Sequence, residues 1–440
     1  MKKLLEIKEF DILTYNKEYI DGKDPDKNDD TKLKYLDEQT FLELESYILT
    51  FNNSESDAVD FFSLGVKKNI GKVIQVKNYV GLIQMKNGYQ IQILPKITNI
   101  NELETKKLFL KMLRCLKDFP SKIFTSANLH SDKMNLYEIF INMYLQQVRE
   151  LVKRGIKSSY ILQKDNLYYY KGKLIISKHI NYNHSHKERF YLQYDEFNVN
   201  RPENKLIKST LIKLMLISQN TSNIKAINQL LSCFDSVDAS KNYSYDFSRI
   251  IIDRNMKEYV LLMKWSKVFL FDQSFTTFSG DNIARSLLFP MEKVFEAYVA
   301  KHLKKIFSEK GYDVIIQDKK YYLFDEPKQF ALIPDIVIEN GRGQSIIVDT
   351  KWKSLKVKPN KNYGISQSDI YQMYAYAKKY DSREIWLLYP FSQETKDLGD
   401  MEFISYKDGE IEVIINVFFV DVANINESIT TLSEKMFYLI

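Results

Sequence analysis

Apolar and polar residues alternate along residues 73–97, on both sides of the dipeptide Asn87-Gly88. A period of two is typical of β-strands with one buried face, and Asn-Gly favours a type I′ turn. This segment is therefore predicted to be a β-hairpin. After Asn99, a candidate N-cap, the apolar residues recur near helical spacing as far as Phe119, which predicts a helix.

The middle of the chain has a mainly helical pattern. Apolar residues follow helical spacing at 134–155 and 203–218, and a tyrosine-rich link is expected at 165–183. Near the N-terminus, the polar segment 16–40 is rich in Asp, Lys and Asn and is predicted to be a loop or insertion.

From Pro290 onward, helical and strand patterns alternate. This order is typical of an α/β sheet covered by helices. The expected elements are helices at 290–307 and 365–380 and strands at 331–340, 344–352 and 383–390.

A chain of 440 residues is long enough for two or three domains. We expect a mixed α+β N-terminal domain at 1–120, a largely helical middle region at 121–280 and an α/β domain at 281–440.

The composition and the first residues of the chain indicate where in the cell the protein is found. Hydrophobic residues make up 45% of the chain, yet no window approaches the about 18 consecutive apolar residues of a membrane span. The start, MKKLLEIKEF, turns charged too soon for a secretory signal, and two cysteines cannot build a disulfide framework. We expect a cytoplasmic protein without membrane association. The net charge of +6 permits nucleic-acid binding but does not require it.

Charged residues end two of the predicted strands. Asp335 follows a proline, and Asp349 and Lys351 form an Asp-x-Lys whose side chains share a strand face. Thirteen residues separate the aspartates, which is enough for a strand, a Gly-containing turn and a return strand. Two such carboxylates can hold Mg²⁺, and the lysine suits activation of a water. Each half alone also fits an ordinary turn or surface ion pair.

The two flanking helices carry further candidates. Gln372 and Tyr376 are four residues apart and share a helix face, where they can hold a phosphate or the lysine. Glu292 and Glu296 share a face in the same way, and either can supply a third metal-binding carboxylate. Solvated surface glutamates have the same spacing, so both readings stay open.

These residues resemble a known pattern. The Pro-Asp at 334–335 and Asp-Thr-Lys at 349–351, with a Glu-bearing helix before them, resemble the PD-(D/E)xK nucleases, and the Gln-x-x-x-Tyr helix resembles their RecB-like branch. Four further segments are similar to the McrC family, including McrC-like subunits of LlaJI-type restriction systems. They are IQILPKI at 91–97, YKGKLIISKHI at 170–180, YDEFNVNRPENKLIKSTL at 194–211 and PMEKVFEAYV at 290–299.

The resemblance implies a DNA endonuclease subunit with a C-terminal PD-(D/E)xK domain, a mixed sheet flanked by helices. Asp335, Asp349 and Glu296 would bind Mg²⁺, for which Mn²⁺ can substitute, and Lys351 would assist the water; Glu292 remains an alternative to Glu296. Gln372 and Tyr376 would line the site.

The resemblance also implies partners: double-stranded DNA and a separate McrB-like AAA+ GTPase on which the N-terminal domain docks. The segment GRGQ at 341–344 lacks the Gly-Lys-Ser/Thr of a P-loop, so we expect the partner, and not this chain, to bind GTP. Two alternatives are a non-catalytic adaptor that stimulates the GTPase and a stand-alone nuclease that needs no partner.

Overall fold

The structure is a computed structural model that describes residues 4–19, 33–54, 61–85, 87–97, 100–117, 136–251, 256–271, 284–340, 344–353, 355, 359–396 and 398–437. It divides into two compact units. One comprises Met1–Ser121 together with Ile283–Ile440, and the other comprises Lys122–Asn282. The predicted division into domains at 1–120, 121–280 and 281–440 stays a prediction.

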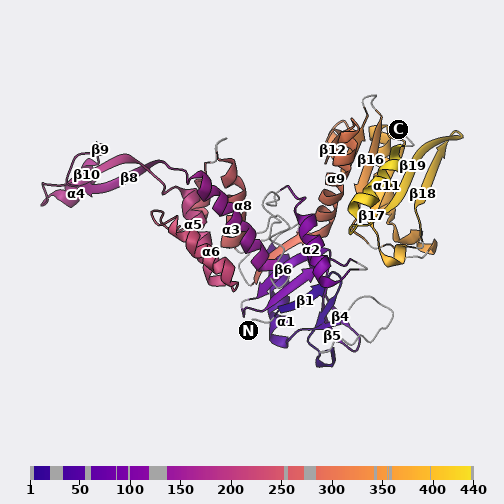
Figure 1. Ribbon diagram of the computed structural model, residues 1–440, viewed down its shortest axis with the longest axis horizontal. Coiled ribbons are helices and arrows are strands. Elements are labelled where there is room, and N and C mark those ends of the chain that lie inside the picture. The colour runs from indigo at the N-terminus through magenta and orange to yellow at the C-terminus, as the bar shows by residue number, and fades with distance from the viewer. Residues whose placement is uncertain are drawn as a thin grey trace. The chain divides into compact units, whose positions relative to one another are not determined.

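Two sheets form the N-terminal part of the first unit (Figure 1), with strand orders β1–β7–β6–β11 and β3–β2–β5–β4. Strands β6 and β7 are buried along their whole length, because α1 and α2 pack on this sheet. The elements are β1 (Leu4–Lys8), β2 (Ile12–Thr14), η1 (Lys17–Tyr19), β3 (Leu33–Tyr35), α1 (Glu38–Ser54), β4 (Phe62–Lys67), β5 (Gly71–Val76), β6 (Tyr79–Met85), β7 (Gln90–Leu94), α2 (Glu102–Leu113) and β11 (Ala284–Pro290).

The segment 16–40, predicted to be a loop or insertion, contains η1, β3 and the start of α1. Its central residues, 20–32, lie outside the described residues. The prediction of a loop or insertion is therefore wrong for Leu33–Tyr35, which pairs with β2, and for the residues from Glu38 onward, which begin α1.

The hairpin predicted around Asn87-Gly88 is confirmed as the antiparallel pair β6–β7. Its turn is not type I′, which needs a positive φ at two successive residues. Gly88 has φ 82°, but its amide donates to the Met85 carbonyl oxygen at 2.9 Å, so Asn87 and Gly88 are not the two central residues of the turn. The Asn87 side chain instead accepts a hydrogen bond from the Tyr89 amide at 2.8 Å and donates one to Thr40 Oγ1 at 3.0 Å.

The helix expected after this hairpin is α2, but its N-cap is Asn101; Asn99 lies outside the described residues. Asn101 Oδ1 accepts from the Glu104 amide at 2.9 Å, and Glu104 returns a contact to the Asn101 amide at 3.4 Å. This reciprocal pair is a capping box, and Glu104 is the acid three positions after the cap.

The C-terminal part of the first unit has the predicted alternation of helices and strands, so the α/β class is confirmed. Its mixed sheet has the order β12–β15–β16–β17–β19–β18. Helix α9 begins after Pro290 as predicted, and alternate residues of the strands pack against α10. The elements are α9 (Met291–Glu309), β12 (Asp313–Ile316), β13 (Tyr321–Asp325), β14 (Lys328–Leu332), β15 (Ile336–Glu339), β16 (Ser345–Thr350), η3 (Pro359–Gly364), α10 (Gln367–Tyr380), β17 (Glu384–Pro390), η4 (Gln393–Thr395), β18 (Met401–Lys407), β19 (Glu410–Val420) and α11 (Ile425–Phe437).

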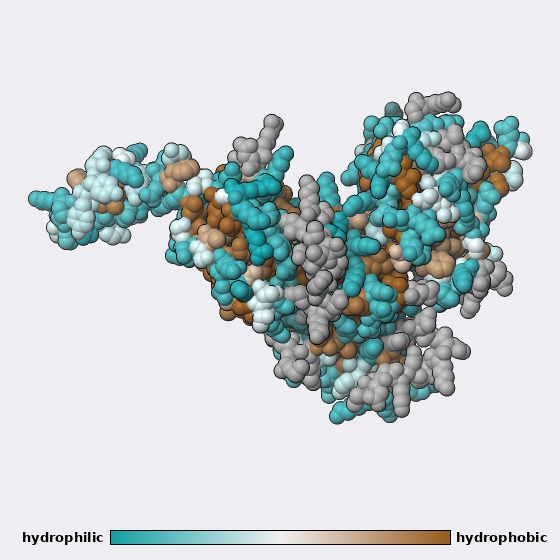
Figure 2. All heavy atoms as spheres, viewed as in Figure 1, coloured by the Kyte–Doolittle hydropathy of each residue, from teal (hydrophilic) through white to brown (hydrophobic). Residues whose placement is uncertain are grey.

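The second unit combines helices with a sheet that the sequence pattern did not predict. Residues 165–183, expected to be a link, lie in the antiparallel sheet β8–β10–β9 and in α4. In Figure 1 these elements form a narrow ribbon, and on the face shown in Figure 2 the ribbon is mostly hydrophilic. The elements are α3 (Leu136–Arg154), β8 (Ser159–Leu167), β9 (Lys173–Leu174), α4 (Ile176–Asn183), β10 (Phe190–Asn198), α5 (Pro202–Ile217), α6 (Thr221–Ser232), α7 (Tyr243–Ser248) and α8 (Lys257–Phe271).

The pairing of β6 with β11 depends on Gly81. This residue has φ +137°, and a Cβ added to it would lie 1.9 Å from the Leu287 carbonyl oxygen. We therefore expect Gly81→Ala to lower the free energy of unfolding by about 1–3 kcal/mol or more, from backbone strain and forced separation of the strands. Equilibrium unfolding in urea measures this loss of free energy. Gly65→Ala is the control, because its nearest contact is Val73 Cγ2 at an ordinary 3.7 Å. Equal stability of the two variants would contradict this role of Gly81.

Candidate active site

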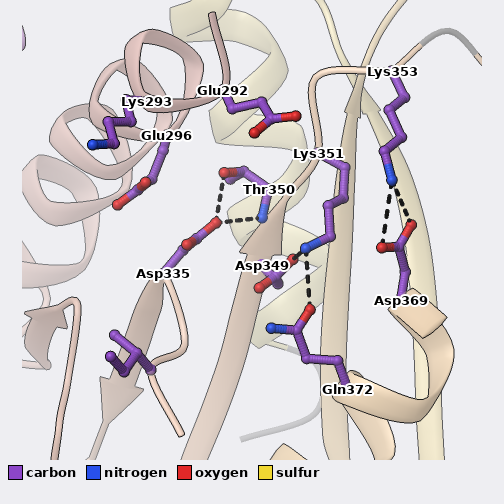
Figure 3. Close-up of a pocket in the computed structure, with 11 residues that line it drawn as sticks. Glu292, Lys293, Glu296, Asp335, Asp349, Thr350, Lys351, Lys353, Asp369 and Gln372 are labelled. Atoms are coloured by element: carbon purple, nitrogen blue, oxygen red, sulfur yellow. Dashed lines mark hydrogen bonds and ion pairs between the residues drawn. The ribbon is translucent and has the colours of Figure 1, made fainter. Parts of the chain in front are cut away.

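The antiparallel pairing of β15 with β16 brings Asp335 and Asp349 together. Ile336 pairs with Val348, so the same register, continued by one residue, places Asp335 opposite Asp349. Opposed residues of an antiparallel pair project to the same side of the sheet. The two carboxylates that the sequence predicted to meet therefore enter one cavity, as Figure 3 shows.

Asp335 is fixed by donors from the neighbouring strand. Its Oδ2 accepts hydrogen bonds from the Thr350 amide at 2.8 Å and from Thr350 Oγ1 at 2.7 Å. The Gln317 side-chain amide lies between two acids, 2.7 Å from Glu296 Oε1 and 3.4 Å from Asp335 Oδ1. One glutamine thus links the first aspartate to helix α9.

Lys351 connects the second aspartate to helix α10. Its Nζ lies 2.8 Å from Asp349 Oδ2 and donates to Gln372 Oε1 at 3.2 Å. Gln372 in turn donates to Tyr376 Oη at 2.8 Å, and Tyr376 donates to the Ile333 carbonyl oxygen at 3.0 Å. The predicted Gln-x-x-x-Tyr face is therefore a chain of hydrogen bonds that orients the lysine, with Tyr376 at its far end.

Of the two candidate glutamates on α9, Glu296 is bridged to Asp335 through Gln317. Glu292 also lines the cavity, but its carboxylate accepts from Asn78 Nδ2 at 3.3 Å. The Gln317 bridge favours Glu296 as the third acid, although the charge of Glu292 also raises the pKa of Asp335.

The cavity has a volume of about 400 Å³ and mixes acids with cations. Lys353 forms an ion pair with the buried Asp369, at 3.1 Å between Nζ and Oδ2. The lining residues are Glu292, Lys293, Glu296, Ile333, Asp335, Asp349, Thr350, Lys351, Lys353, Asp369 and Gln372.

Burial and mutual repulsion raise the pKa values of the carboxyl groups of Asp335, Asp349 and Glu296. Burial, followed by the charge of Asp335, raises the pKa of Asp349 to about 7 and that of Glu296 to about 7. Burial also raises the pKa of Asp335, against the lowering effect of its hydrogen bonds from Thr350. For Lys351, burial pushes the pKa down, but Asp349 outweighs it and the net shift is upward. Lys351 is therefore a cation at neutral pH.

The donor chemistry fits a hard divalent cation. Asp349 Oδ2 is buried and lies 2.8 Å from the Lys351 ammonium, and because a carboxylate oxygen has two lone pairs it can still accept a second ligand. Carboxylate oxygens are the ligands Mg²⁺ prefers. Among the described residues, no three His, Cys, Asp or Glu side chains are already arranged as a metal-binding group. The Gln317 amide lies between Glu296 and Asp335 and occupies one acceptor position on each.

Sequence reasoning missed Gln317 and Thr350. Thr350 stands between Asp349 and Lys351, so its place in the motif could have indicated a hydrogen bond to the opposite strand. Gln317 has φ 54° just after β12, and no sequence signal marks it.

Residues 74–390 match the family described as McrBC 5-methylcytosine restriction system component. The chain belongs to this family, which confirms the family resemblance seen in its sequence motifs. A comparison with curated proteins gives no match.

Among solved structures, the chain is similar to one described as a refined half-complex from a tetradecameric assembly of Thermococcus gammatolerans McrB AAA+ hexamers with bound McrC. The TM-score is 0.64 at 17% identity, over 98% of this chain and 100% of that chain. A cryo-EM structure of the Thermococcus gammatolerans McrBC complex gives a TM-score of 0.46 at 20% identity, over 68% and 87% of the two chains. The first likeness supports the mixed α/β fold.

Within the part of the chain that the structure describes, none of the helices combines the length and the hydropathy needed to cross a bilayer.

The raised pKa values predict how stability depends on pH without metal. The folded protein keeps protons on Asp349 and Glu296 up to about pH 7, whereas the unfolded chain releases them near pH 4. Stability should therefore fall as the pH rises from about 4 to about 7. Since Asp349→Asn removes one buried charge, it should raise the melting temperature at pH 8 in EDTA, by about 2–4 °C for each kcal/mol gained.

Differential scanning calorimetry from pH 5 to 8 measures this effect, with Asp313→Asn, an exposed position on β12, as control. An Asp349→Asn protein that melts below wild type at pH 8 would contradict the raised pKa.

Proposed function

We propose that this chain is the DNA endonuclease subunit of a McrBC-type restriction system and that its C-terminal part is a PD-(D/E)xK nuclease domain. The observation that carries the proposal is the convergence of Asp335, Asp349 and Lys351 in one cavity, from two hydrogen-bonded strands. These side chains, and not the fold, support this activity, because one fold can host many activities.

The arrangement of elements around the cavity supports this class of domain. Helix α9 precedes the antiparallel pair β15–β16, and helix α10 leads from β16 to the parallel strand β17. The acids thus come from strand ends and one helix, which are rigid supports for a catalytic group.

Asp335, Asp349 and Glu296 would hold Mg²⁺, with Mn²⁺ as a substitute. When bound, such an ion polarises a phosphate oxygen and lowers the pKa of a water. In the hydrolysis, a water oxygen bonds to phosphorus, one P–O ester bond breaks, and the departing oxygen takes up a proton.

Lys351 acts in this scheme as a fixed positive charge. The neighbouring Asp349 raises the pKa of Lys351 against the lowering effect of burial, which favours the protonated ammonium. The ammonium, held by Asp349 and Gln372, stabilises negative charge that develops at the phosphate. Lys293 and Lys353 line the same cavity, where they can contact neighbouring phosphates of the DNA backbone.

The partner in this proposal is a McrB-like AAA+ GTPase, which binds the GTP. Support comes from membership of the McrBC component family and from the similar McrC, whose structure is described as bound to McrB AAA+ hexamers. We place the protein in the cytoplasm, where its DNA substrate is found.

The nuclease site predicts which variants cannot cut. With Mg²⁺, GTP and the GTPase partner, wild type should cleave plasmid DNA, whereas Asp349→Asn and Lys351→Ala should lose at least about 100-fold in rate. Both variants should still stimulate GTP hydrolysis, since they change only the cavity. Gel assays on methylated and unmethylated plasmid measure cleavage, and phosphate release measures the GTPase.

Asp313→Asn and Lys319→Ala serve as charge-matched controls at exposed positions outside the cavity. If Asp349→Asn cuts as fast as wild type, the nuclease centre is not here. If neither wild type nor any variant cuts DNA while all of them stimulate the GTPase, the chain is an adaptor and not a nuclease. Cleavage by the chain without its partner would indicate a stand-alone nuclease.

Metal binding can be measured apart from cleavage. Mg²⁺ should raise the melting temperature of wild type, because a ligand at 100 times its Kd stabilises the folded state by about 2.7 kcal/mol. Asp349→Asn should show little or no such shift, and Asp313→Asn should keep it. An equal shift in all three proteins, measured by scanning calorimetry, would place the bound Mg²⁺ outside this cavity.

A further inference from the structure

A buried carboxylate of the N-terminal sheet lies against the residue that follows Lys351. Both oxygens of Glu9 are 3.1 Å from Trp352 Nε1, and each accepts from the indole N–H. Glu9 has no exposed surface, and Trp352 is 4% exposed. This contact joins residues 343 positions apart in the sequence within the first unit.

Glu9 is held firmly on its own side. Its amide donates to the Leu94 carbonyl oxygen at 3.0 Å, and its Oε2 accepts from the Lys96 amide at 3.0 Å. The chain reverses directly after it, at Phe10 with φ 68°, in a turn closed by the Lys8 amide and Asp11 Oδ2 at 2.8 Å. The carboxylate therefore has little freedom to follow a moving tryptophan.

Trp352 is held firmly on the other side as well. Its ring lies 5.3 Å from that of Phe295, which immediately precedes Glu296 on α9. Lys351 is the neighbour of Trp352, and its amide donates to the Leu388 carbonyl oxygen at 2.8 Å. Because the two residues are consecutive, the contacts that anchor the indole also restrain the backbone from which the Lys351 side chain enters the cavity.

The same N-terminal sheet also fixes the start of α9. Strand β11 pairs with β6 and runs directly into this helix. The Met291 amide donates to the Asn78 carbonyl oxygen at 3.0 Å, and Asn78 Nδ2 donates to Glu292 at 3.3 Å. Helix α9 and the segment that carries Lys351 form two walls of the cavity, and both are thus anchored to the same N-terminal sheet.

Glu9 is not required for the chemistry of the cavity, which it does not line. Burial raises its pKa to about 8, against the lowering effect of its hydrogen bonds from Lys96 and Trp352. A buried acid is costly compared with an apolar residue of similar size. Stability alone would therefore favour another residue at this position, whereas orientation of the indole needs an acceptor.

We propose that Glu9 is a positioning residue, which holds Lys351 in register with Asp349 through Trp352, so that the N-terminal sheet is part of the nuclease centre. This inference rests on the proposed nuclease function. It assigns no contact between Glu9 and the substrate.

The test compares Glu9→Ala, Glu9→Gln and Trp352→Phe in the full chain with partner, GTP and Mg²⁺. Glu9→Ala and Trp352→Phe should lower the single-turnover cleavage rate at saturating DNA by about 10- to 100-fold, since small misplacements of catalytic groups have effects of this size. The DNA concentration for half-maximal rate and the stimulation of GTP hydrolysis should stay within about twofold of wild type. Glu9→Gln should restore most of the rate, because its amide oxygen still accepts from Lys96 and Trp352.

Thr40→Val is the matched control. Thr40 is buried in the N-terminal part and its hydroxyl is bonded to Asp37 and Asn87, so its replacement also removes hydrogen bonds there, but none of them involves Glu9 or Trp352. The inference is overturned if folded Glu9→Ala and Trp352→Phe cut at the wild-type rate, if Thr40→Val is impaired equally, or if Glu9→Gln fails to rescue. The proposed function fails separately, when wild type and Asp349→Asn do not differ.

Discussion

The candidate site depends on one constraint, the burial of two like charges at the end of a β-hairpin. The β15–β16 register places Asp335 opposite Asp349 in a cavity where repulsion between them costs free energy. The hydrogen bonds from Thr350 stabilise the Asp335 carboxylate, and the ion pair with Lys351 stabilises that of Asp349. In such a site the ionised carboxylates are destabilised unless a cation neutralises them. This property is expected of a metal-dependent centre and not of a hydrophobic core.

The supports of this site come from distant parts of the sequence. Helix α10 orients Lys351 through Gln372 and Tyr376, and the N-terminal sheet reaches the same lysine through Glu9 and Trp352. Because β11 continues into α9, that sheet also fixes the helix bearing Glu296. A change at the N-terminal sheet therefore has a short physical route to both walls of the cavity.

The sequence was most informative where a motif and its local structure coincide. Asp335, Asp349 and Lys351 could be predicted to meet because a short hairpin leaves few alternatives for its register. Asn101 was missed as the α2 cap because Asn99 and Asn101 each have a Glu three positions later, so the capping-box pattern fits both. Local pattern could not find Gln317, whose role depends on the distance between two acids that only the folded chain sets.

Tertiary context explains the remaining differences. Residues 165–183 carry tyrosines and lysines without clear alternation, because much of the ribbon β8–β10–β9 is exposed on both faces and has no buried stripe. Glu9 was missed for a different reason. An acidic residue beside a strand is expected to be solvated, and its burial depends on Trp352, which lies 343 residues away in the sequence.

The most direct test is the location of the metal. Crystals soaked in Mn²⁺ and measured at an anomalous wavelength should show a peak bounded by Asp335, Asp349 and Glu296, and crystals of Asp349→Asn should lack it. A wild-type crystal with no peak in this cavity, at an Mn²⁺ concentration that supports cleavage in solution, would contradict the account.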